Sequence, residues 1–295
     1  MYPRLFALAL GLVAPLVAIA APTPAADVLT PFGHRPAANV HHVPKGASVH
    51  HVGDEVHIID ATGAVIHKTT PSGNFTKTVP SSHPGTLQTG WIAYAYWLNT
   101  LTTPINYFTS TWVVPSTPAS VDGQTVFLFN SIEPSSGNAI LQPVLQFGSS
   151  AAGGGNYWAV ANWYGINNVY YYTALQTVST GQSLQGVITL TNPSTCGSAS
   201  TCNYQSAFSG MSNTMSVTGS AQLTWATETL EAYNLVSNKD FPPVSMTFGN
   251  IGITTTAGSP SVTWSVVDST TDNVDAIVLR QGSTNAAVEI LYHNI

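Results

Sequence analysis

The chain has 295 residues, which is enough for one large domain with a sizeable core and a smaller additional region. Only 7% of the residues are charged and 44% are hydrophobic, a composition usual for secreted all-β proteins and unusual for cytosolic enzymes. From residue 84 onward, two basic residues, Lys239 and Arg280, stand against nine acidic ones, a formal charge of −7 at pH 7. This charge disfavours binding to nucleic acid.

The first 21 residues have the pattern of a secretory signal peptide. Arg4 precedes the apolar run 5–21, which ends in small residues and is interrupted by Pro15. The run is too short for a membrane span, and no later segment has the length and apolarity of one. We therefore expect a secreted, extracellular protein that does not bind a membrane.

Residues 22–84 form a region rich in histidine. Eight of the nine histidines lie between His34 and His83, so the region gains positive charge as they protonate, near a reference pKa of about 6.5. We interpret it as a pro-segment released on acidification; a solvated extension with fortuitous metal affinity is the alternative. Within it, 56–68 predicts a hairpin, and 77–90 predicts a linker where processing occurs. A glycosylation sequon begins at Asn74.

Residues 85–295 have the pattern of strands rich in aromatic and β-branched side chains and separated by turn residues. We expect strands at 91–98, 107–114, 125–132, 156–164, 169–175, 184–190, 222–233, 261–267 and 287–293. This pattern predicts an all-β domain, an antiparallel two-sheet sandwich of jelly-roll (concanavalin-like) type. Cys196 and Cys202 are expected to form a disulfide that closes a small loop.

The residue types after residue 84 exclude several catalytic chemistries. His293 is the one histidine there, two positions from the end of the sequence, which disfavours a Ser–His–Asp or Cys–His site. A zinc site normally needs several His or Cys ligands, and the Asp-Thr-Gly or Asp-Ser-Gly pattern of pepsin-like enzymes is absent. We therefore expect neither a metal nor another cofactor, and carboxylates, amides, hydroxyls and aromatic rings remain as the functional groups.

The stretch 224-TWATETLEAYN-234 contains two glutamates three positions apart. Residues at this spacing on a strand point to opposite faces, so Glu228 and Glu231 cannot be a paired acid and base. Glu231 shares its face with an aromatic and hydroxyl-bearing set that suits a substrate groove: Trp225, Thr227, Thr229 and Tyr233. The pattern alone also leaves open that both glutamates are ordinary surface residues.

Five segments, taken in order, resemble motifs of the fungal glutamic peptidases (eqolisins). They are 109-TSTWVVPSTP-118, 127-FLFNSIEP-134, 139-AILQPVLQFG-148, 157-YWAVANWY-164 and 226-ATETLEAY-233. In that family the A-I-L-Q stretch carries the catalytic glutamine, and the second glutamate of A-E-W-I-V-E-D-F is catalytic. Matching without a gap implies these roles for Gln142 and Glu231, and none for Glu228. The resemblance also implies a double antiparallel sheet and a precursor that works in acid.

The resemblance implies a set of substrate-binding positions: Phe129, Glu133, Tyr157, Asn162 and Tyr164. Three positions depart from the family pattern, because Phe129 replaces a tryptophan, Asn162 replaces a glutamate of the substrate cleft, and Pro143 follows the glutamine. These departures leave Gln142 and Glu231 in place, while they bear on substrate affinity, on cleavage preference and on whether the activity is kept.

The sequence therefore predicts a monomeric acid endopeptidase that acts on polypeptides. Glu231 is the expected general base and Gln142 the expected stabiliser of the oxyanion. One alternative is a concanavalin-like glycoside hydrolase that pairs Glu231 with Glu133, although the E-x-D-x-x-E strand that many such glucanases resemble is absent. The other is a non-catalytic carbohydrate-binding protein.

Overall fold

The structure is a computed structural model that describes residues 26–73, 87–197 and 201–293. The expected signal peptide, the sequon at Asn74 and most of the expected linker lie outside the described residues. Within the described ranges the chain forms 21 strands and two 3-10 helices, η1 (Ala37–Asn39) and η2 (Asn238–Asp240), with no α-helix. None of the helices in these ranges is therefore long and apolar enough to cross a membrane.

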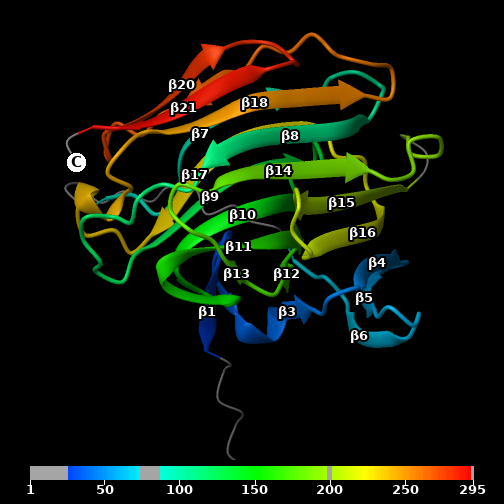
Figure 1. Ribbon diagram of the computed structural model, residues 1–295. Coiled ribbons are helices and arrows are strands. Elements are labelled where there is room, and N and C mark those ends of the chain that lie inside the picture. Colours follow the sequence, from blue (N-terminus) through cyan, green and yellow to red (C-terminus); the bar gives the residue numbers. More distant parts are fainter. Residues whose placement is uncertain (1–25, 74–86, 198–200, 294–295) are drawn as a thin grey trace, which may run out of the picture.

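Two large sheets pack face to face as a sandwich, which confirms the predicted fold class (Figure 1). The first sheet runs, in spatial order, through β19 (Ser265–Val267), β7 (Gly90–Leu98), β17 (Trp225–Tyr233), β9 (Thr125–Glu133), β10 (Ala139–Ser150), β11 (Gly153–Ile166), β12 (Val169–Thr173) and β3 (Val40–Val43), with β13 (Gln176–Thr177) paired to β11.

The second sheet runs through β20 (Val274–Arg280), β21 (Ala286–Tyr292), β18 (Met246–Thr255), β8 (Ile105–Val113), β14 (Ser183–Leu190), β15 (Cys202–Phe208), β16 (Thr214–Ser220), β4 (Ser48–Val52), β5 (Glu55–Ile59) and β6 (Val65–Thr69). The main hydrophobic core lies between the two sheets. Strand β14 alternates buried and partly exposed residues because only one of its faces meets the first sheet. Strand β9 is buried at every residue because both of its faces are covered.

The described part of the histidine-rich region is built into this sandwich. Strand β3 pairs with β12 and extends the first sheet, while β4 pairs with β16 and extends the second. These are the two parallel pairs among the strands of the described residues, and the remaining pairs are antiparallel. The hairpin predicted at 56–68 corresponds to β5 and β6, whose turn is held by the Asp60 carboxylate accepting from the Thr62 N–H at 2.8 Å.

A further hairpin, β1 (Asp27–Thr30) with β2 (Gly33–Pro36), lies against the first sheet on the side away from the second sheet (Figure 1). Its turn needs Gly33, whose φ of +95° is in the region that favours glycine. The Leu29 carbonyl accepts from the Ala151 N–H at 2.7 Å, and the side chains of Leu29 and Phe32 join a second hydrophobic cluster. The hairpin therefore covers the outer face of the first sheet.

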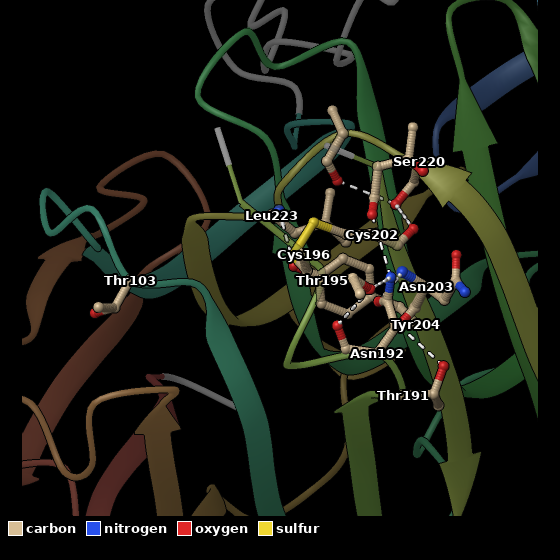
Figure 2. Close-up of a disulfide and its surroundings, with 12 residues drawn as sticks. Thr103, Thr191, Asn192, Thr195, Cys196, Cys202, Asn203, Tyr204, Ser220 and Leu223 are labelled. Carbon is tan, nitrogen blue, oxygen red and sulfur yellow. Dashed lines mark hydrogen bonds between the residues drawn. A yellow bond between two sulfur atoms is a disulfide. The ribbon is translucent and has the colours of Figure 1, made fainter. Parts of the chain in front are cut away.

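The predicted disulfide between Cys196 and Cys202 is present, at the loop between β14 and β15 (Figure 2). Cys202 is fully buried at the start of β15, so the bond ties the loop to the sheet. Asn192 in the same loop donates to the Thr195 hydroxyl at 3.0 Å and accepts from the Asn203 N–H at 2.7 Å. These contacts give the loop a fixed base beside the disulfide.

Candidate active site

The outer face of the first sheet, called here the covered face, holds most of the residues that the sequence singled out. Residues on β10 alternate, so Ile140, Gln142, Val144 and Gln146 point to this face while their neighbours point into the main core. Phe127, Phe129, Val144 and Trp163 supply much of its apolar surface. The β1–β2 hairpin lies across it.

Gln142 is fully buried on the covered face. Its register partner on β11 is Trp163, and the register that pairs Leu141 with Ile132 places Ser131 of β9 on its other side. Neither the Oε1 nor the Nε2 atom of Gln142 has a hydrogen-bond partner among the described residues. A buried amide without partners is costly, so this group is a candidate for binding a ligand.

Glu231 is also fully buried on the covered face, on β17. The Tyr233 hydroxyl donates a hydrogen bond to its Oε1 atom. Tyr233 in turn contacts the hairpin, because its ring lies edge-on to the His34 ring with centroids 6.4 Å apart. The hairpin therefore lies over the surroundings of Glu231 as well as those of Gln142.

Gln142 and Glu231 point to the same face of the first sheet, but they do not lie directly across the strands from each other. Glu231 is opposite Phe127 on β9, and Phe127 is opposite Gln146 on β10, so Gln142 lies four residues farther along its strand. With two strand spacings between β17 and β10, the Cα atoms of Gln142 and Glu231 are about 17 Å apart. In this covered state, one water molecule does not bridge them.

A chain of hydroxyl groups fills part of this gap. Ser131 Oγ and Thr227 Oγ1 are 2.7 Å apart, and Thr227 Oγ1 and Thr229 Oγ1 are 2.9 Å apart. All three side chains are fully buried. Sequence reasoning placed both threonines on this face but missed Ser131, whose alternation with Phe129 on β9 was the available signal.

Three of the expected substrate-binding residues lie on the covered face. Phe129 is buried against Trp91, with ring centroids 5.8 Å apart, and lies between the rows of Gln142 and Glu231. Tyr157 lies at the far end of β11 and is 45% exposed. Glu133 is fully buried at the end of β9, and after burial and the neighbouring Tyr96 its charge also raises the pKa of Tyr94.

Glu133 is diagonal to Gln142 on adjacent strands, a relation that keeps long side chains within about 7–8 Å of each other. Its relation to Glu231 is different. Glu133 is opposite Trp225, six residues from Glu231, which corresponds to about 20 Å along the strand. A retaining glycosidase holds its two carboxyl groups about 5–5.5 Å apart, so the register does not support pairing Glu133 with Glu231.

Asn162 and Tyr164, expected to bind substrate, point away from the covered face. They flank Trp163 on β11, so alternation directs them toward the second sheet. The Asn162 amide donates to the Asn213 carbonyl at 2.9 Å and accepts from the Ser206 hydroxyl at 2.8 Å. The Tyr164 hydroxyl is 2.7 Å from His51 Nε2. Both side chains are structural in this state, and we leave them out of the candidate site.

Glu228 also points toward the second sheet, which agrees with the alternation predicted for the two glutamates. It is fully buried, and the Ser110 hydroxyl of β8 donates to its Oε2 atom at 3.0 Å. Burial raises the pKa of this carboxyl well above its usual range. Glu228 is therefore a neutral acid in acidic solution and has no access to the covered face.

Residues 26–73, 87–197 and 201–293 contain no group of three or more His, Cys, Asp or Glu side chains that could hold a metal ion. The rings of His41 on β3 and His67 on β6 lie 4.2 Å apart. The chemical groups of the covered face are thus carboxyl, amide, hydroxyl and aromatic.

No family model matches the chain, and no curated protein matches it. Among solved structures it is similar to scytalido-glutamic peptidase with a transition state analog inhibitor, at 19% identity and a TM-score of 0.46, covering 70% of this chain and 100% of that one. It is similar to SCP-B, a member of the eqolisin family of peptidases in a complex with the tripeptide Ala-Ile-His, at 19% identity and a TM-score of 0.43, covering 68% and 98%. Likeness at this level carries no argument about the reaction.

Proposed function

We propose that the chain is the precursor of a secreted acid endopeptidase that hydrolyses peptide bonds with water. The observation that carries the proposal is that Gln142 and Glu231 are both fully buried on one face of the first sheet, where the β1–β2 hairpin packs against Trp163 and Tyr233. A groove lined by a carboxylate, an unbonded amide and aromatic rings suits an extended peptide, and a covering segment keeps it closed until that segment leaves.

In this proposal Glu231 is the general base. Its carboxylate takes a proton from a water molecule, the water oxygen attacks the peptide carbonyl carbon, and the proton then passes to the leaving amine. The Gln142 Nε2–H donates to the oxyanion that forms on the carbonyl oxygen. The Tyr233 hydroxyl, bonded to Glu231, orients the carboxylate. The reaction needs no covalent intermediate.

The proposal requires a change in the covered face after the hairpin leaves. The Cα atoms of Gln142 and Glu231 are about 17 Å apart in the covered state, so their side chains must approach each other over Phe129 and Thr229. Gln142 has no side-chain hydrogen bond to the described residues that it would have to break. Glu133, diagonal to Gln142, is the other carboxyl group that could take the role of base.

Histidines at the contact between the N-terminal region and the sandwich favour release in acid. Burial, with a smaller contribution from the charge of His67, lowers the pKa of His41 to about 4, where it packs on Tyr171 of β12. Burial, with a smaller contribution from His50, lowers the pKa of His51 to about 4, where it meets Tyr164 of β11. Lowered values mean that the docked state binds fewer protons, so docking weakens as the pH falls from about 6.5 toward 4.

The test is the activity of acid-treated protein on a denatured protein substrate between pH 2 and 7. We expect Glu231→Gln to lower the rate by about 10²–10⁴-fold, as loss of a general base does, and Gln142→Ala by about 10²–10³-fold. Glu289→Gln, on β21 of the second sheet, is the control and should retain activity, while Glu133→Gln tests the other carboxyl group of the covered face. Retained activity in Glu231→Gln contradicts the assignment, and loss confined to Glu133→Gln moves the base to Glu133.

A further inference from the structure

The tip of the β1–β2 hairpin places an aromatic side chain in a pocket of the covered face. Phe32 is 3% exposed, and its ring is stacked on Tyr170 of β12 with centroids 4.8 Å apart and planes 23° apart. The edge of the Trp163 indole faces the same ring at 6.3 Å and 75°. We call this space, with Trp163 and Tyr170 as walls, the Phe32 pocket.

The sheet is built to leave room for a ring at this point. The register partner of Tyr170 on β11 is Gly165, two residues after Trp163 on the same face. That position therefore carries no side chain, and the space beside Tyr170 is filled by Phe32. The Phe32 N–H donates to the Thr30 hydroxyl at 3.2 Å, and this hydroxyl donates to the Gly33 carbonyl at 2.9 Å, so a short turn presents the ring.

The pocket adjoins unsatisfied polar groups. Trp163 is the register partner of Gln142, so the pocket wall is one strand away from the Gln142 amide. Trp163 Nε1 and both polar atoms of the Gln142 side chain are buried without a hydrogen-bond partner among the described residues. An extended peptide whose side chain replaced Phe32 would bring backbone N–H and C=O groups to these atoms.

We propose that the Phe32 pocket is a substrate subsite for an aromatic side chain, and that Phe32 occupies it in the precursor as a stand-in for that residue. Two rings that contact Phe32, one stacked and one edge-on, favour an aromatic over an aliphatic side chain by the geometry of ring pairs. The ligand class is therefore a peptide with phenylalanine or tyrosine. The inference rests on the proposed peptidase function only for the claim that the peptide is cleaved.

A binding experiment on the full chain at pH 7 tests the pocket without requiring catalysis. Full-length Phe32→Ala is titrated with N-acetyl-L-phenylalaninamide and with N-acetyl-L-leucinamide, followed by calorimetry. We expect the phenylalanine probe to bind this variant at least ~10-fold more tightly than the unaltered chain, in which Phe32 competes, and ~10-fold more tightly than the leucine probe. Leu29→Ala removes a buried side chain of the same hairpin and should gain no binding.

Equal binding of the two probes, or equal binding to Leu29→Ala, overturns the aromatic pocket. If Phe32→Ala does not fold, Phe32→Leu keeps most of the volume and removes the ring, and the same preference for the phenylalanine probe is expected; absence of that preference overturns the proposal as well. Binding without cleavage supports the pocket and counts against the peptidase.

A second measurement links the pocket to the reaction. Acid-treated protein should cleave a peptide carrying phenylalanine with a kcat/KM about 10–200-fold above that of the matched leucine peptide. Tyr170→Leu removes the stacking wall and should reduce this ratio toward one while leucine peptides are still cleaved. Cleavage with no difference between the peptides leaves the peptidase standing and overturns the subsite.

Discussion

Glu228 is a carboxyl group enclosed between two sheets. Its Oε2 accepts from Ser110, its Oε1 has no hydrogen-bond partner in the described part of the chain, and its register partner on β9 is Asn130. A charge without compensation is very costly in such a place, so the group keeps its proton and its pKa is raised. The same sequence stretch thus holds one glutamate for the core and one for the covered face.

This placement gives a pH dependence of stability with a definite sign. Since the folded pKa of Glu228 lies above the unfolded value of about 4.3, the folded state binds more protons, and stability falls as the pH rises above that value. The glutamine of Glu228→Gln is neutral at every pH, so this variant should lose less stability as the pH rises. The free energy of unfolding, measured in urea at pH 4 and at pH 7, gives the size of this loss. Glu289→Gln, at a half-buried position on β21, is the control, and an unchanged slope in Glu228→Gln would contradict the assignment.

Alternation along a single strand explains which site residues could be predicted from the sequence. The face of Glu231 follows directly from its two-residue spacing with Thr229 and Tyr233, and the structure agrees. Asn162 and Tyr164 were assigned from motif similarity alone. The alternation of side chains along β11 puts Trp163 on the covered face, so its two neighbours point toward the second sheet. Applying this alternation to the sequence would have removed both residues from the predicted site.

At the scale of elements, the long aromatic strands β7, β9, β11 and β17 were predicted close to their observed bounds. The sequence did not predict β15, β16 and β18, whose Ser, Thr, Gly and Asn content resembles that of turns. It also did not predict β20 (VDAIVLR), which contains none of these residues. Strand β18 shifts register against β21 between Phe248 and Ile251. It shifts twice against β8, between Gly249 and Gly252 and between Thr254 and Thr255, and such bulges break a two-residue pattern. The pairing of β3 and β4 with the sandwich joins distant segments, which no local pattern specifies.

Strand β4 carries the histidine that should set the pH of release. The His51 Nε2 atom lies 2.7 Å from the Tyr164 hydroxyl, and protonation of the His51 ring disfavours its largely buried position against β11. His51→Gln retains a hydrogen-bonding side chain that does not titrate, so docking of β4 should persist to lower pH than in the unaltered chain. Hydrogen exchange of residues 48–52 against pH measures the midpoint.

His293→Gln is the matched control, because His293 pairs with Asp275 at an exposed position on the sandwich at 2.8 Å and does not contact β4. It should leave the midpoint unchanged. A midpoint that stays the same in His51→Gln assigns release to the other histidines of the region.

For the whole molecule, protonation of Glu228 and protonation of His41 and His51 change stability in opposite directions. The core with Glu228 gains relative stability as the solution becomes acidic, while docking of the N-terminal region, through His41 and His51, loses it. Acidification should therefore separate the covering segment from a sandwich that remains folded. Monitoring β4 and β9 by hydrogen exchange in one pH series checks this, and simultaneous loss of protection in both strands would contradict it.

The parallel pairing of β3 with β12 and of β4 with β16 has a consequence for the chain once the segment has gone. Strands β12 (VYYYT) and β16 (TMSVTGS) would become outermost, with unpaired backbone groups and with neither charge nor proline to keep other strands away. Unpaired edge strands of this kind form β-sheet hydrogen bonds with strands of other molecules. The N-terminal segment thus also protects the chain against aggregation. The protein without this segment should self-associate as its concentration rises, most of all near neutral pH, where the segment would otherwise be bound.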